Sequence, residues 1–306
     1  MAAKKININK YISEVKRNMN LDISDEIIRK DLLLTLVMAE FEKEKDVFLE
    51  LIFKGGTLLS RHYLNYHRFS EDLDFVYKNC KILRDLSTNQ REKQIKTFID
   101  MFVPKLKKVC DEIDLEFDVN RSNTKFCTII NKRAIYIFRL YYSDNNYIKI
   151  EINFVEKLLY EPKMVSVKAI TDYFDSKRLF FILGLSYENF NVLSYPIEEI
   201  IIEKYRALLT RPNYQERDMF DLFLIKDSLR VDKNDVIEKI KASSLIKKDL
   251  SKVIKTNYDK LKNNEFFIGY ESAEDLAIIK FDKNEFELFK EKVKLILIDI
   301  CEEYLK

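Results

Sequence analysis

Residues 54–75, KGGTLLSRHYLNYHRFSEDLDF, combine a glycine pair, a hydroxyl side chain and two carboxylates that are two positions apart. If Leu73 lies in a strand, Asp72 and Asp74 point to the same side of it, because successive side chains alternate between the two faces. Two carboxylates on one face can hold Mg2+ through their oxygen atoms. Asp72 and Asp74 are therefore candidate metal ligands, although a DxD pair by itself is more often a pair of surface residues.

The glycine pair supplies the second half of this pattern. The chain has only four glycines in 306 residues, and two of them, Gly55 and Gly56, are neighbours, which indicates that the backbone needs them there. They precede Thr57 at a predicted strand-to-helix turn, where backbone N–H groups at the start of a helix favour a phosphate. Such a turn followed by a carboxylate pair predicts a metal-dependent nucleoside triphosphate site.

Residues 147–154 alternate strictly between apolar and polar side chains, which predicts a strand with one buried face. Lys149 and Glu151 fall on its polar face. They can form a cross-strand salt bridge on an exposed surface. Alternatively, strand pairing brings Glu151 beside Asp72 and Asp74 as a third carboxylate, which would bind metal or accept a proton. Both interpretations remain open at this point.

Two ionisable residues within 201–223, Lys204 and Asp218, fall on apolar helix stripes. A charge in apolar surroundings is costly unless it is paired or functional. One interpretation is a buried Lys204–Asp218 pair that locks a helical hairpin. The other places Lys204 on a triphosphate, with Asp218 as an orienting or catalytic carboxylate. Weaker candidates of the same kind are Arg206, Arg211, Arg217 and Asp221.

The elements that must position these residues follow from hydrophobic periodicity and turn residues. In the N-terminal part, the pattern predicts helices at 26–46, 57–65 and 90–113, and strands at 48–53, from residue 73, at 114–119, within 125–142 and at 147–154. From Pro196 onward it predicts helices at 197–209, 214–229, 234–240, 247–262 and 284–305. The expected fold is α+β, with an α+β domain over residues 1–195 and a mostly α-helical domain over residues 196–306.

The composition fits a soluble protein with a substantial core, since 47% of the residues are apolar and 34% are charged. No apolar run reaches the ~18 residues that span a bilayer, and the N-terminus lacks the apolar segment of a signal peptide. We therefore expect a cytoplasmic protein without a membrane partner. The four cysteines have no CxxC spacing, which favours reduced thiols over a zinc site. The scarcity of glycine nearly excludes a glycine-rich dinucleotide-binding fold.

Charge is unevenly distributed, although the net charge is only +2. Residues 239–262 hold eight lysines against two aspartates. A lysine-rich helical stretch can bind the phosphates of a nucleic acid. The other interpretation, which we favour, is a solvated helix face.

The motifs together resemble the AbiEii/AbiGii group of abortive-infection nucleotidyltransferase-like toxins, within the DNA polymerase β-type nucleotidyltransferase superfamily. The resemblance rests on blocks that come in the family's order: Lys54-Gly55-Gly56-Thr57, Arg68-Phe69-Ser70-Glu71-Asp72-Leu73-Asp74, Lys149-Ile150-Glu151-Ile152, and Lys204, Arg211, Arg217, Asp218 and Asp221. The gap between Gly56 and Asp72 is longer than is usual in the superfamily, but it suits this group.

The resemblance implies a mixed-sheet nucleotidyltransferase core followed by a helical domain, with the active site in the cleft between them. It implies nucleotide binding by Gly55, Gly56, Thr57, Ser70 and Lys204, and Mg2+ binding by Asp72 and Asp74. Either Glu151 or Asp218 would be the third carboxylate of the catalytic set. Family members pair with a cognate antitoxin, and some modify the 3′ acceptor end of tRNA and so block translation.

The resemblance thus implies a toxin of a toxin–antitoxin or abortive-infection (phage defence) system, which transfers nucleotides from NTP to an RNA acceptor, expected to be the tRNA 3′ end. Two other functions stay open from the sequence. The same site could transfer a nucleotide to a protein or a small molecule, or the chain could be a nucleotide-binding pseudoenzyme that acts through a partner.

Overall fold

The computed structural model describes residues 8–19, 23–131, 133–169, 190–228, 230–243, 250–268, 272 and 277–306. The chain divides into two compact units, which are described separately below. Unit 1 comprises Met1–Glu156 and Pro162–Ser194, and unit 2 comprises Lys157–Glu161 and Tyr195–Lys306. No helix in the described ranges has the length and apolar character needed to cross a membrane.

Among the described residues, unit 1 is built on a seven-stranded sheet with the order β3-β4-β5-β2-β1-β7-β6. The strands are β1 (Leu51–Lys54), β2 (Asp72–Tyr77), β3 (Cys127–Ile130), β4 (Ile135–Tyr141), β5 (Tyr147–Asn153), β6 (Lys163–Val167) and β7 (Phe190–Ser194). β2 is antiparallel to β1 and parallel to β5, and β7 is parallel to β1. The predicted α+β class with a mixed sheet is confirmed.

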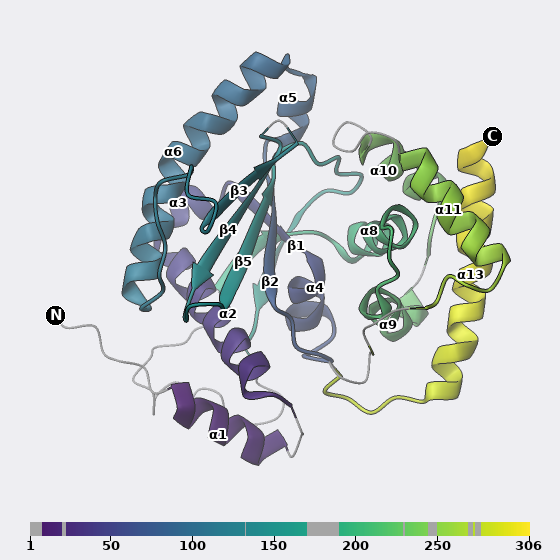
Figure 1. The fold of residues 1–306 in the computed structure, drawn as a ribbon, viewed down its shortest axis with the longest axis horizontal. Helices are drawn as coiled ribbons and strands as arrows, with labels where there is room; N and C mark the ends of the chain where they lie inside the picture. The colour runs from purple at the N-terminus through teal and green to yellow at the C-terminus, as the bar shows by residue number, and fades with distance from the viewer. Residues whose placement is uncertain are drawn as a thin grey trace. The chain divides into compact units, whose positions relative to one another are not determined.

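The helical elements of unit 1 lie around this sheet, except for the first helix, which contacts the second (Figure 1). They are α1 (Ile8–Met19), α2 (Asp25–Lys43), α3 (Lys45–Phe48), α4 (Gly55–Leu58), the π-helix η1 (Leu59–Tyr63), α5 (Cys80–Asp85) and α6 (Thr88–Glu112). α6 contributes aromatic rings to the core: the centroids of Phe98 and Phe154 are 5.7 Å apart, and those of Phe102 and Phe138 are 5.4 Å apart. The apolar sheet face is therefore covered by α6.

Side-chain alternation separates the two faces of the central strands. Ile148, Ile150 and Ile152 of β5 and Leu73 of β2 are fully buried, as the predicted alternation of residues 147–154 requires. Because neighbouring side chains in a strand point to opposite faces, Asp72 and Asp74 lie on the face that α6 does not cover. The sheet thus has an apolar face under α6, and the opposite face carries the partly exposed Asp72 and Asp74 at the beginning of β2.

The structure departs from the predicted elements of unit 1 in several places, and the helices α1 and α5 were not predicted. The strand predicted at 48–53 begins only at Leu51, because Phe48 ends α3 and stacks on Phe41 with 3.4 Å between centroids. The segment 114–119 is not a strand, and only Glu116 forms an isolated bridge, to Tyr141. Strands β6 and β7 were missed; β7 is short and is held by pairing with β1 and β6, which local sequence does not reveal.

Unit 2 is helical in its described residues, which agrees with the helices predicted after Pro196. They form α8 (Ile197–Thr210), α9 (Glu216–Leu224), the 3-10 helix η2 (Lys226–Ser228), α10 (Lys233–Ser243), α11 (Leu250–Lys262) and α13 (Lys283–Leu305). The helix predicted at 214–229 is interrupted after Leu224, and its last residue lies outside the described residues. The first three residues of the helix predicted at 247–262 also lie outside them.

Candidate active site

The carboxylate pair stands at the beginning of β2, where Asp72 and Asp74 flank the fully buried Leu73. The parallel pairing of β2 with β5 aligns Asp72 with Lys149 and Asp74 with Glu151. Residues in register on adjacent strands project to the same face. The structure therefore brings Glu151 to the carboxylate pair, as one of the two interpretations of the sequence requires.

Lys149 forms the cross-strand salt bridge that the other interpretation of the sequence predicts. Its Nζ lies 2.9 Å from Oδ2 of Asp72, and both side chains are about one-third exposed (30% and 33%). Burial alone would lower the pKa of Lys149, but the charges of Asp74, Asp72 and Glu151, together with the hydrogen bond to Asp72, raise it above its ordinary value. The ammonium group thus stays charged beside the carboxylates, and the two interpretations describe one cluster.

The glycine pair is in direct contact with this cluster and its supporting loop. Gly55 has φ of +84°, a left-handed conformation that side-chain-bearing residues rarely adopt. A Cβ atom on Gly55 would lie 2.6 Å from Oδ2 of Asp74, and one on Gly56 would collide with the guanidinium group of Arg68. The turn therefore needs glycine at both positions. Gly55 allows the left-handed backbone, and Gly56 leaves room for the buried Arg68.

Substitution of Gly55 tests this requirement. We expect G55A to reduce the free energy of unfolding by about 1–2 kcal/mol from the left-handed backbone alone, with a further loss because the methyl group would push against Asp74. Asn65 is the matched control, because its φ is also positive (46°) but it already carries a side chain. Chemical denaturation should show a smaller loss for N65A, and equal losses would argue against the contact with Asp74.

Thr57 connects the turn to the first carboxylate. Its side chain is almost fully buried (2% exposed), and its hydroxyl lies 2.6 Å from Oγ of Ser70 and 2.5 Å from the carbonyl oxygen of Asp72. The neighbouring Ser60 donates to the carbonyl oxygen of Arg68 at 2.6 Å. These bonds tie the helical segment after the glycines to the loop that enters β2, so Thr57 positions Asp72.

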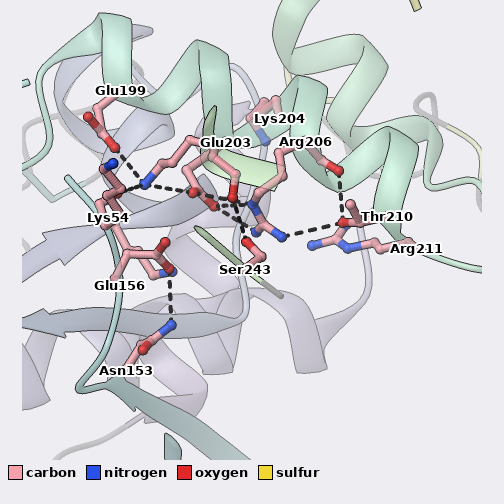
Figure 2. Close-up of polar contacts among 12 residues, drawn as sticks. Lys54, Asn153, Glu156, Glu199, Glu203, Lys204, Arg206, Thr210, Arg211 and Ser243 are labelled. Atoms are coloured by element: carbon pink, nitrogen blue, oxygen red, sulfur yellow. Dashed lines mark hydrogen bonds and ion pairs between the residues drawn. The ribbon is translucent and has the colours of Figure 1, made fainter. Parts of the chain in front are cut away.

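Two further residues of unit 1 support the turn from β1 and from the end of β5. Lys54, which is in register with Asp74, has its Nζ 3.7 Å from Oε2 of Glu156. The side-chain amide of Asn153 donates to the same carboxylate oxygen at 3.0 Å, as Figure 2 shows. Sequence reasoning missed Asn153 and Glu156, because the alternation of residues 147–154 places Asn153 on the polar face, whereas it is buried (4% exposed).

A buried ion pair supports η1, which follows the turn directly. Arg61 is 1% exposed and donates to Oδ1 and the carbonyl oxygen of Asp31 at 2.8 and 2.9 Å, and to Oγ1 of Thr35 at 2.9 Å. π-helical turns are rare and often occur at functional sites. The pair anchors this unusual segment to α2 and was also missed, since Asp31 and Arg61 lie thirty positions apart.

In unit 2, Lys204 of α8 forms ion pairs with two carboxylates of α9. Its Nζ lies 2.9 Å from Asp218 and 2.6 Å from Asp221, and Asp218 also pairs with Arg211. Burial would raise the pKa of Asp218, but Lys204 and Arg211 outweigh it and lower the pKa below its ordinary value. The predicted Lys204–Asp218 pair is present, and it joins the two helices of the hairpin.

Replacing Lys204 distinguishes its contribution to stability from a contribution to the reaction. K204M leaves two buried carboxylates without their ammonium partner, and we expect a loss of about 3–5 kcal/mol in the free energy of unfolding. The loss should shrink in acid, because protonation removes the uncompensated charges. K226M, which breaks an exposed pair with Glu285 in the same unit, should cost below ~1 kcal/mol. If K204R keeps the stability but loses nucleotide transfer, Lys204 acts in the reaction as well.

Two other charged residues of α8, Glu203 and Arg206, contact each other within the helix. Glu203 accepts from Arg206 at 2.7 Å, and Arg206 also donates to Oγ1 of Thr210 at 3.3 Å (Figure 2). Glu203 is also paired with Lys239 of α10 at 3.0 Å. Arg206, a weaker sequence candidate, therefore belongs to a network that holds α8 to α10.

The donor set at β2 supplies oxygen ligands of the kind that Mg2+ prefers. Within the described part of the chain, no group of three or more His, Cys, Asp and Glu side chains is arranged to hold a metal. Mg2+, however, is usually bound through one or two carboxylates plus substrate phosphates. Asp72 and Asp74 supply two carboxylates on one face, and the ammonium of Lys149 lies beside Asp72.

The mixed sheet, with a carboxylate pair beside a strand–Gly-Gly–helix turn, is what the resemblance to a nucleotidyltransferase core implies. Comparison with known families agrees with this class. Residues 37–293 match the family described as nucleotidyl transferase AbiEii toxin, type IV toxin–antitoxin system. The match covers most of the chain, so the chain belongs to the AbiEii family, and the predicted resemblance is confirmed.

The solved structures that resemble this chain include MenT4, a nucleotidyltransferase toxin from Mycobacterium tuberculosis H37Rv. The superposition has a TM-score of 0.48 at 14% sequence identity, and it covers 96% of this chain and 99% of that chain. None of the curated proteins compared with the chain matches it.

Proposed function

We propose that this AbiEii-family chain transfers a nucleotide from an NTP to an RNA acceptor. The proposed acceptor is the 3′ end of tRNA, and Asp72 and Asp74 bind Mg2+. The observation that carries the proposal is the contact between the turn and the carboxylates, where Gly55 leaves room for Oδ2 of Asp74. Phosphate binding and metal binding are thereby expected within one small cluster.

Each residue has a part in this proposal. The backbone of Gly55 and Gly56 binds the triphosphate, and Thr57 and Ser70 hold the turn against the entrance to β2. Mg2+, when bound, would polarise the phosphate that is attacked and lower the pKa of the attacking hydroxyl. Lys204 contacts the phosphates and offsets their charge.

Glu151 is proposed as the third carboxylate, because it is in register with Asp74. From there it would accept the proton of the acceptor hydroxyl. Asp218 is proposed to orient Lys204, with which it is paired. A catalytic role for Glu151 predicts that E151Q loses transfer while it keeps its fold.

The lysine-rich stretch supports RNA as the acceptor. Lys252 and Lys255 of α11 are exposed and lie one turn apart, so both are accessible to the phosphates of a nucleic acid.

The physiological setting follows from the family, whose type IV toxin–antitoxin systems imply an antitoxin partner. We propose that the toxin acts in the cytoplasm, where NTPs and tRNA are present, and that its growth arrest limits phage replication. The four cysteines are buried free thiols, which suits a reducing compartment.

The test is to incubate the protein with Mg2+ and each labelled NTP, and to offer RNA, protein and small-molecule fractions separately. The proposal expects label in RNA, at the 3′ end of tRNA, and no transfer when EDTA is present. Label in the protein or metabolite fraction would support the alternative acceptors instead. Growth inhibition that persists when both Asp72 and Asp74 are substituted would support a pseudoenzyme.

A further inference from the structure

Three carboxylates lie on the same face of β2 and β5, and their negative charges repel one another when no metal is bound. Asp72 and Asp74 are two positions apart on β2, and Glu151 is in register with Asp74 on β5. Like charges on adjacent positions of a sheet repel one another and destabilise it. A folded chain without metal therefore needs a positive charge of its own at this place.

Lys149 supplies that charge from the position in register with Asp72. Its Nζ is 2.9 Å from Oδ2 of Asp72, and the charges of Asp74 and Glu151 also act on it. Both side chains of the pair are about two-thirds buried, so water screens their attraction only in part. The pair is thus a substantial local interaction and more than a surface contact.

We propose that Lys149 is an internal counter-ion, which neutralises the carboxylate cluster in the metal-free protein and is displaced from Asp72 when a divalent cation binds. The inference rests on the proposed function, because it takes Asp72 and Asp74 to be the metal ligands. It adds that metal binding exchanges one cation for another. Lys149 therefore lowers the affinity for the metal, and it neutralises the carboxylates when no metal is bound.

The competition has a direct physical basis. An oxygen of Asp72 that accepts a hydrogen bond from an ammonium group must give it up, at least in part, to coordinate a metal ion. A positive charge that remains within a few ångströms also repels the metal. Removing the charge of Lys149 should therefore tighten metal binding, whereas removing a residue that orients the ligands should weaken it.

The experiment titrates the full-length protein with Mn2+ alone, without nucleotide, and follows free Mn2+ by electron paramagnetic resonance. K149M should lower the apparent Kd for Mn2+ by about tenfold or more, and K149R, which keeps the charge, should stay near the wild type. K125M is the matched control, because it removes an ion pair of the same 2.9 Å length, to Glu116, from the same unit. It should leave the Kd unchanged.

Thermal unfolding gives a second readout that does not depend on activity. In EDTA, K149M should have a lower Tm than the wild type, because its carboxylates have lost their counter-ion. Saturating Mn2+ should reduce that difference, whereas the smaller difference caused by K125M should stay constant.

The outcomes separate the two proposals. An unchanged or weaker affinity in K149M would overturn the counter-ion role but leave the metal site standing, provided that D72N abolishes Mn2+ binding. Absence of Mn2+ binding in both the wild type and K149M, if it persists when NTP is added, would overturn the metal site and the counter-ion together.

Discussion

Asp72→Ala should reduce nucleotide transfer by on the order of 10³-fold or more and should relieve growth inhibition. The proposed reaction needs both carboxylates of β2 to hold the metal, and loss of several kcal/mol of charge stabilisation corresponds to a loss of this size. The rate of label transfer from NTP to a tRNA pool measures the first effect, and colony formation on induction of the toxin measures the second. Asp74→Ala should act in the same way.

Asp100→Ala provides the control for this prediction. Asp100 is an exposed carboxylate of α6 that pairs with Arg121, so its loss should leave transfer and toxicity intact. Because Asp72 also holds Lys149, the Tm of each variant must be measured, and D72N should be used if D72A is unstable. Full toxicity in a folded Asp72 variant would contradict the assignment.

Arg61→Met should cause the largest loss of stability in unit 1, about 3–5 kcal/mol in the free energy of unfolding. The substitution leaves Asp31 buried without its cation, and an unpaired buried charge is far more costly than a missing contact. Desolvation already raises the pKa of Asp31 even though Arg61 opposes it. Urea unfolding, with the midpoint and slope measured separately, checks the prediction.

Two further variants give this prediction its control. R121M breaks an ion pair of the same 2.8 Å length, with Asp100, but at an exposed position, and should cost below ~1 kcal/mol. The double variant D31L/R61M removes both charges, so it should recover part of the stability lost in R61M. If R61M and R121M are equally stable, the buried pair does not anchor the π-helix.

The parts of the fold that were predictable are those in which local pattern and final environment agree. The alternation of residues 147–154 indicated β5, because every second side chain there is buried in the sheet. The isolated glycine pair indicated the turn, because the backbone conformation at Gly55 and the space at Gly56 depend on the residue itself. In both cases, the cause lies within a few residues of the effect.

The missed features depend on residues that are distant in the chain. The burial of Arg61 is explained by its ion pair with Asp31 of α2. The position of Lys54 is explained by its ion pair with Glu156, which follows β5. No periodicity marks such pairs, because a buried charge looks like a surface charge until its partner is known. β7 was missed for the same reason, since its place in the sheet is decided by β1 and β6.

The interior position of β1 in the sheet has a consequence for folding during synthesis. β1 leads into the glycine turn and lies between β2, which follows soon after it, and β7, which ends at Ser194. Since a nascent chain emerges from its N-terminus, β1 keeps one unpaired edge until the ribosome has released β7. An unpaired edge invites pairing with other chains. Translation past Ser194 therefore completes the framework of the turn, and a stalled, shorter product is expected to be a substrate for chaperones rather than an active toxin.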